Sequence, residues 1–139
     1  MDNLNLGWMA AFGLLIIRLV IGLTFVGHGA QKLFGWFGGT GPSETGKWLE
    51  SIGIRPAGTI WAVIAGVFEL VGGLLFTVGW LTWLGAALII VIMIDAIITV
   101  HGKNGYWAQN GGFEYNLVLI AVVLGVAFIG PGQYALFQP

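Results

Sequence analysis

Four long apolar stretches dominate the pattern of hydrophobic and polar positions along the chain. They cover about residues 9–33, 58–79, 81–100 and 114–131. A helix needs about 20 apolar residues to cross the hydrocarbon core of a bilayer, whereas barrel strands are about half as long and alternate in polarity. The pattern therefore predicts an all-α membrane protein, an antiparallel bundle of four transmembrane helices built as a single domain over residues 1–139.

The connections between these stretches differ in length and composition. Residues 35–56 are rich in Gly, Pro, Ser and Thr, and residues 101–113 are polar and aromatic. Only Gly79-Trp80-Leu81-Thr82 separates the second and third stretches, which predicts a tight antiparallel hairpin. Gly130-Pro131-Gly132 is a helix stop after the fourth stretch.

The first connection contains a predicted short helix from Ser43 to Ile52. Ser43 is a suitable N-cap, and the apolar face of the helix carries Trp48, Leu49 and Ile52. One interpretation is an interfacial helix that lies on the membrane as an anchor. The other is a lid over a site.

Composition supports the membrane assignment and excludes several classes. The 139 residues are 58% apolar and 8% charged, with a mean hydropathy of +0.92, whereas a soluble domain carries about 25% charged residues. A net charge of −1 leaves no basic surface for nucleic acid. The absence of cysteine excludes disulfides, thiol redox centres and Fe–S clusters. Trp and Tyr near the ends of the stretches indicate contact with a lipid bilayer.

The distribution of basic residues predicts an orientation. Four of them flank the two long connections: Lys32, Lys47, Arg55 and Lys103. The positive-inside rule then places the connections 35–56 and 101–113 in the cytoplasm and both termini outside, in a multi-pass protein of the cytoplasmic membrane.

Two residues of opposite charge fall deep inside the first and second stretches. Measured from the connection side at about 1.5 Å per residue, Arg18 lies roughly 22 Å deep and Glu69 roughly 17 Å deep. Charges inside a bilayer are costly unless they are paired. We therefore predict a buried ion pair between them, either a structural lock that specifies helix pairing or a functional element.

His28 and Asp95 form a shallower predicted layer, each roughly 7–8 Å below the connection-side boundary. A carboxylate at hydrogen-bond distance would hold the imidazole in one tautomer. This pair is either a structural hydrogen bond or a group that handles protons or binds a ligand. Two histidines at different depths do not indicate a metal or haem site.

A third group of polar residues marks the mouth of the bundle, and two of its members have simpler explanations. Glu114 could favour the N-terminus of the last helix through the helix dipole, and His101 could be a solvated residue of the connection. The group comprises Lys32, His101 and Glu114, with Gln31 and Asn116 nearby.

Small and polar residues recur at helical spacing in three of the stretches, which favours close helix packing around a shared interior. We predict a polar half-channel that opens toward the two long connections and closes at Arg18 and Glu69. The three faces carry Arg18, Gly22, Phe25, Gly29 and Lys32; Ala62, Gly66, Glu69, Gly73 and Phe76; and Glu114, Val118, Ala121 and Gly125.

Several motifs follow one another along nearly the whole chain. They are Arg18-Leu19-Val20-Ile21-Gly22, His28-Gly29-Ala30-Gln31-Lys32-Leu33, Phe68-Glu69-Leu70-Val71-Gly72-Gly73, His101-Gly102-Lys103-Asn104-Gly105-Tyr106-Trp107, Gly112-Phe113-Glu114-Tyr115-Asn116-Leu117 and Gly130-Pro131-Gly132-Gln133-Tyr134. Through these motifs the chain resembles the DoxX family of small membrane proteins.

The resemblance implies a four-helix membrane fold and a link to quinone-dependent oxidation, as in thiosulfate:quinone oxidoreductase. Other members are named as oxidoreductases tied to catechol, quinone or oxidative stress, and some act with soluble partner enzymes. Asp95 has no clear place in the family pattern. The positions that match it are Arg18, His28, Lys32, Glu69, His101 and Glu114.

These observations favour a membrane component of a quinone-linked oxidoreductase. With no dinucleotide fingerprint and no haem pair, the chain has no evident cofactor of its own, so redox work would need either a bound quinone or the cofactor of a partner enzyme. The candidate catalytic residues are His28, Lys32, Asp95, His101 and Glu114. The candidates for contact with the quinone are Phe25, Gln31, Tyr106 and Trp107.

Two alternatives remain open. The chain could be a non-catalytic membrane subunit or assembly factor that recruits a soluble redox enzyme through residues 35–56 and 101–113. It could also be a small transporter or proton pathway, for which four short helices would need a homo-oligomer to provide two gates.

Overall fold

The computed structural model describes residues 4–135, with side chains from residue 7 onward, and is all helical over that range. Four apolar helices occupy the predicted stretches: α1 (Leu4–Phe34), α3 (Gly58–Val78), α4 (Thr82–Ala96) and α5 (Glu114–Ile129). Three helical segments are long and apolar enough to cross a membrane, Gly7–Phe34, Gly58–Val78 and Thr82–Asn104, and α5 is a shorter apolar helix. The prediction of an all-α membrane protein with four apolar helices is confirmed.

The remaining elements are short. Helix α2 (Gly41–Ser51) lies between α1 and α3, and a π-helical turn, η1 (Ile97–His101), continues α4. Two 3₁₀ turns, η2 (Gly102–Asn104) and η3 (Ala108–Asn110), follow before α5 begins.

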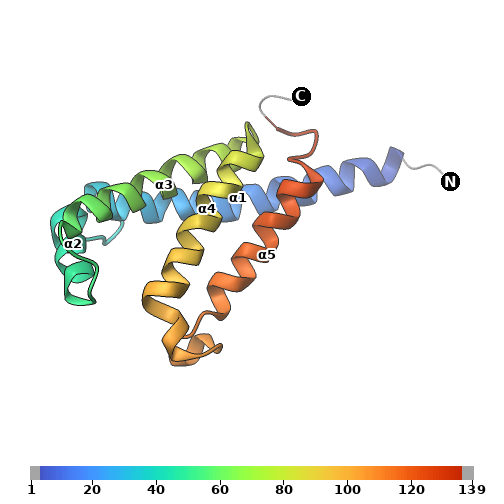
Figure 1. The fold of residues 1–139 in the computed structure, drawn as a ribbon. Coiled ribbons are helices and arrows are strands. Elements are labelled where there is room, and N and C mark those ends of the chain that lie inside the picture. The colour runs from blue at the N-terminus through green and yellow to red at the C-terminus, as the bar shows by residue number, and fades with distance from the viewer. Residues whose placement is uncertain (1–3, 136–139) are drawn as a thin grey trace.

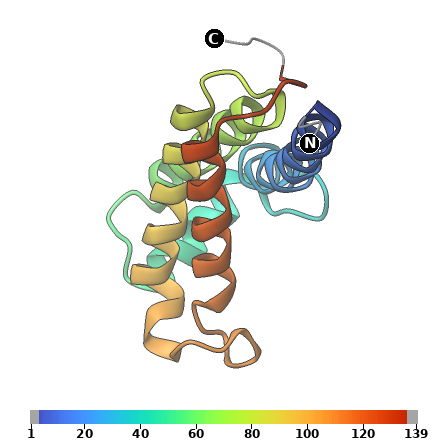
Figure 2. The same cartoon turned by 90° about the vertical axis from the view of Figure 1, so that its right-hand side faces the viewer.

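The four apolar helices form two antiparallel pairs that cross each other. Helices α1 and α3 lie side by side, as do α4 and α5, and α3 joins the pairs through its contact with α4 (Figures 1 and 2). From the Gly79 turn, α4 diverges from α3, so α2 lies beside the start of α3 while the η turns lie beyond the end of α4 (Figure 1). The parallel packing of a compact four-helix bundle is therefore not confirmed.

Glycines bring α1 and α3 into close contact. A Cβ atom on Gly29 would lie 2.7 Å from the Gly66 carbonyl oxygen, and one on Gly73 would lie 2.6 Å from that of Gly22. Real Cβ atoms do not approach backbone this closely, so glycine is required for the helices to touch. The predicted close packing of the first two stretches is confirmed.

The inner face of α5 differs from the predicted one. Asn116, Leu119, Val123 and Val126 are buried, whereas Val118 is half exposed and a Cβ on Gly125 would meet nothing within 4 Å. The predicted face of Glu114, Val118, Ala121 and Gly125 is therefore wrong. Because α5 is apolar around its whole circumference, spacing alone did not identify the side that packs on α4.

Helix α2 begins earlier than predicted and is fixed against α3. It starts at Gly41 with Thr40 as N-cap residue, so Ser43 lies inside the helix and is not its cap. Gly46 is buried against the backbone of Thr59. The Gly58 amide donates a hydrogen bond of 2.8 Å to Glu50 Oε2. These contacts hold α2 at the start of α3.

Candidate functional site

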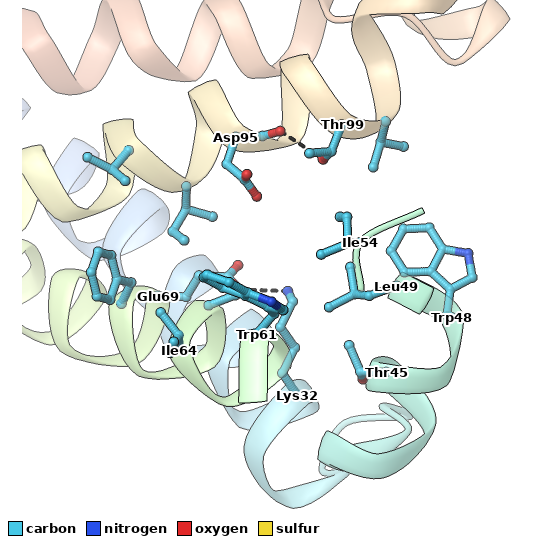
Figure 3. A pocket seen from close by; sticks show the side chains of 15 residues that line it. Lys32, Thr45, Trp48, Leu49, Ile54, Trp61, Ile64, Glu69, Asp95 and Thr99 are labelled. Carbon is cyan, nitrogen blue, oxygen red and sulfur yellow. Dashed lines mark hydrogen bonds and ion pairs between the residues drawn. The ribbon is translucent and has the colours of Figure 1, made fainter. Parts of the chain in front are cut away.

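A cavity of about 420 Å³ lies where the two helix pairs diverge (Figure 3). Helices α2 and α3 form one side, and α4 with the π turn η1 forms the other. Most of the lining is apolar, which is typical of small-molecule sites. Five polar side chains contribute to it: Lys32, Thr45, Glu69, Asp95 and Thr99.

Lys32 and Glu69 form an ion pair on one wall of the cavity. Lys32 Nζ lies 2.6 Å from Glu69 Oε1, and the two side chains are 29% and 3% exposed. At this distance the two opposite charges attract each other directly, and burial of the carboxylate strengthens that attraction. The pair joins α1 to α3 and places a positive charge at the cavity surface.

The predicted pair between Arg18 and Glu69 is wrong. Arg18 is buried, and its guanidinium donates to three carbonyl oxygens, those of Thr77 at 3.1 Å, Pro131 at 2.9 Å and Tyr134 at 3.2 Å. It thus joins the middle of α1 to the end of α3 and to the segment that follows α5. Its positive charge is stabilised by backbone dipoles instead of by a carboxylate.

The register of α1 against α3 explains this exchange of partners. Gly22 lies against Gly73 and Gly29 against Gly66, and the same register brings Arg18 level with Thr77. Side chains of a helix lean toward its N-terminus. Because the helices are antiparallel, Lys32 and Glu69 lean toward each other and meet.

The predicted His28–Asp95 pair is also wrong. His28 Nδ1 lies 3.3 Å from Gln31 Oε1, one turn along the same helix. Its ring lies 6.0 Å from that of Phe25, a residue of the buried core. His28 therefore faces groups of its own helix, and it is not among the residues that line the cavity.

Asp95 instead points into the cavity from α4, toward the wall that carries Lys32 and Glu69 (Figure 3). Within the part of the chain that the structure describes, its carboxylate has no hydrogen-bond or ion-pair partner. Its backbone carbonyl accepts a 2.8 Å hydrogen bond from Thr99 Oγ1. The π turn that follows widens the helix, and such turns are frequent at functional sites.

Other predicted site residues hold the connections in shape. Gln31 Nε2 donates to the Phe37 carbonyl at 3.2 Å. His101 Nδ1 lies 2.7 Å from the Gly111 carbonyl, and Glu114 Oε1 accepts from the Ala108 amide at 3.0 Å. None of these three side chains lines the cavity.

The two candidate aromatic contacts of the second connection lie outside the cavity as well. The rings of Tyr106 and Trp107 are 4.9 Å apart, edge to face, and Tyr106 lies 5.5 Å from the ring of Phe113. Trp107 is 59% exposed. Together these three residues form an exposed aromatic cluster on the connection between η2 and α5.

The sequence prediction missed the aromatic wall of the cavity. Trp48 of α2 and Trp61 and Phe68 of α3 line it, although the positions of the two tryptophans near the ends of the apolar stretches indicated interfacial anchors. Trp48 and Leu49 face the cavity from α2 (Figure 3). Helix α2 thus forms one wall of the cavity, and its contacts with α3 hold that wall in place.

Comparison with known proteins now identifies the family. The DoxX family profile matches residues 13–102. The chain belongs to the DoxX family. The match includes Lys32, Glu69 and Asp95, the three ionisable residues of the cavity. As a DoxX-family protein with several apolar helices, the chain is a multi-pass membrane protein in contact with lipid.

Two relatives cover most of the chain. It is 32% identical over 130 residues to "Uncharacterized membrane protein Rv3486" of Mycobacterium tuberculosis, an alignment that spans 86% of this chain and 76% of the relative. It is 32% identical over 114 residues to "Putative oxidoreductase CatD" of Bacillus subtilis, spanning 82% and 78%. No solved structure matches the chain significantly.

Proposed function

We propose that this protein is the membrane component of a quinone-linked oxidoreductase and that the cavity holds the quinone ring. The observation that carries the proposal is the convergence of an ammonium group and two carboxylates in an otherwise apolar, aromatic cavity of about 420 Å³. Cavities of roughly 300–1,000 Å³ bind drug-sized molecules. The name of the Bacillus subtilis relative describes an oxidoreductase, which agrees with this function.

The cavity surface suits a lipid-soluble ligand. Its rim carries apolar side chains that are exposed on the helices, including Trp61, Ile64 and Val91. On a membrane helix such a surface faces lipid. A quinone dissolved in the bilayer could therefore enter sideways, with its ring between the aromatic wall and α4 and its tail in lipid.

The ionisable side chains would orient the ring. Lys32 keeps N–H donors for a quinone oxygen beside its contact with Glu69, and Asp95 lies on the opposite wall. A quinone carries the redox chemistry when bound, and a soluble partner enzyme would exchange electrons with it. The chain itself would bind the ring, orient it and hold protons near its oxygens.

A cavity-filling variant tests this proposal without altering any charge. Ala65 lines the cavity, whereas Ala87 is exposed on α4 outside it. We expect Ala65→Phe to weaken binding of a short-chain ubiquinone analogue at least tenfold, measured by equilibrium dialysis in mild detergent. Ala87→Phe should leave the affinity unchanged. Equal binding by both variants would contradict the proposed site, and no binding by the unmodified protein would contradict the proposed function.

The exposed aromatic cluster supports a second proposal, a subunit that recruits a soluble redox enzyme. Tyr106 and Trp107 are exposed beside Phe113, and exposed aromatic residues are common in protein interfaces. Crosslinking from a photoreactive group at residue 107 to a soluble protein would support recruitment. Crosslinks to lipid alone would assign the cluster to membrane anchoring.

We further propose that the protein spans the cell membrane with α2 and the η turns on the cytoplasmic side. The positive-inside rule supports this orientation, since basic residues flank these segments. The chain has no native cysteine. The single substitutions Lys103→Cys and Gln133→Cys therefore report on the two opposite sides of the membrane. In intact cells, a membrane-impermeant maleimide should label residue 133 only. Labelling of residue 103 alone would reverse the orientation.

A further inference from the structure

The hydrogen-bonding groups of the cavity are unevenly distributed between donors and acceptors. Thr99 directs its hydroxyl proton to the Asp95 carbonyl, and the hydroxyl oxygens of Thr45 and Thr40 lie 3.0 Å apart. Glu69 is engaged with Lys32. The donors that remain for a ligand are the Lys32 ammonium group and the indole N–H groups of Trp48 and Trp61, all on the wall opposite α4, and the acceptor on the α4 wall is the free carboxylate of Asp95.

Lys32 and Asp95 make different demands on a ligand. An ammonium group only donates hydrogen bonds, and a carboxylate only accepts them. A ligand that spans the cavity must therefore present an acceptor toward Lys32 and a donor toward Asp95 (Figure 3). A quinone offers two carbonyl oxygens, which are both acceptors, so one of them would face the carboxylate without a hydrogen bond.

The reduced form of the same ring meets both demands. Each hydroxyl of a hydroquinone can donate or accept, so one can accept from Lys32 while the other donates to Asp95. Hydrogen bonds from a hydroxyl to an ionised carboxylate are short and strong. We infer that the cavity selects the reduced diol of the quinone couple over the quinone, with Asp95 as the residue that determines this specificity.

This inference rests on the proposed function and specifies which redox form of the ligand the cavity binds more tightly. A hydrogen bond to a charged group changes affinity by about tenfold or more. We therefore expect the diol to bind at least tenfold more tightly than the quinone. Each tenfold preference for the two-electron reduced form raises the midpoint potential of the bound couple by about 30 mV.

The test compares both forms of one short-chain ubiquinone analogue under anaerobic conditions. Affinities are measured by equilibrium dialysis for the unmodified protein, for Asp95→Asn and for Glu44→Gln, which changes an exposed carboxylate outside the cavity. The amide of Asn both donates and accepts. Asp95→Asn should therefore bind the two forms equally or prefer the quinone, while Glu44→Gln should retain the preference for the diol.

A ligand series on the unmodified protein keeps the test independent of the folding of any variant. The dimethyl ether of the diol has the same ring but no hydroxyl donor, so it should bind as weakly as the quinone. Equal affinity for diol and quinone, or for diol and dimethyl ether, would overturn the inference and leave the proposed site intact. A preference that persists in Asp95→Asn would also overturn it. Failure of every form to bind would reject the proposed function itself.

Discussion

Lys32 Nζ lies 2.6 Å from Glu69 Oε1, so the buried carboxylate of α3 is paired with the last turn of α1 and not with Arg18. Glu69 is almost completely buried, whereas Lys32 reaches the cavity. Removing one partner therefore has a different effect on the charge of the other. An ammonium left alone can be hydrated through the cavity, but a buried carboxylate left alone cannot.

This asymmetry predicts the order of stability in a mutant cycle. We expect Lys32→Met to lower the free energy of unfolding by about 3 kcal/mol, because it leaves a buried charge unpaired. Glu69→Gln should cost less, and the double variant should recover much of the loss from Lys32→Met. Equilibrium unfolding in mixed micelles measures all three, with Lys103→Met in the exposed η2 turn as control. Equal losses from Lys32→Met and Lys103→Met would show that the pair does not stabilise the fold.

The glycines of α1 provide a matched pair of variants for the contact with α3. A Cβ on Gly29 would lie 2.7 Å from the backbone of Gly66 and Leu70, whereas a Cβ on Gly27 would meet nothing within 4 Å. Gly29→Ala should destabilise the protein by roughly 1–3 kcal/mol through overpacking. Gly27→Ala should be neutral or stabilising by up to about 1 kcal/mol, since alanine favours the helix. Thermal unfolding in one detergent compares the two, and a reversed order would disprove the register between α1 and α3.

Arg18 should hold the segment after α5 in place. Arg18→Lys keeps the charge but loses the planar fork that reaches several carbonyls, so the contacts with Pro131 and Tyr134 should weaken. We expect amide hydrogen exchange over residues 132–135 to become at least tenfold faster. Arg55→Lys changes an exposed arginine and serves as control. Unchanged exchange in Arg18→Lys would show that other contacts hold this segment.

His101 should act on the shape of the second connection and not on ligand affinity. Its ring nitrogen contacts the Gly111 carbonyl, which Asn104 also approaches at 3.1 Å. We expect His101→Ala to increase hydrogen exchange over residues 102–112 while the affinity for a short-chain quinone analogue changes less than twofold. A large loss of affinity with unchanged hydrogen exchange would instead show that His101 contributes to ligand binding.

The hydrophobic pattern was sufficient to predict the helices of this protein. Apolar runs of membrane-spanning length leave few alternatives, because backbone groups in lipid must be satisfied within a helix. The glycine and alanine spacing of α1 and α3 also predicted their contact, since only small residues permit it. In both cases the structure follows from residues that are close together in the sequence: a long apolar run forms a helix, and regularly spaced small residues permit a close helix contact.

The partners of the charged residues depended on information that the sequence does not carry. Depth arithmetic placed Arg18 beside Glu69 because it assumed helices aligned at their connection ends. The actual register aligns Arg18 with Thr77, and the lean of the side chains brings Lys32 to Glu69. An error of one helical turn, about 5.4 Å, is enough to exchange one partner for another.

The cavity likewise arises only from the tertiary arrangement. The sequence pointed to Lys32, Glu69 and Asp95 as unusual in apolar helices, but not to their common site with Trp48 and Trp61. That site exists because α4 diverges from α3 and α2 covers the space between them (Figures 1 and 3). Helices that are apolar on all sides carry no pattern that specifies a crossing direction. The sequence by itself thus determined the class, the helices and the α1–α3 contact, and packing of whole helices decided which polar groups meet.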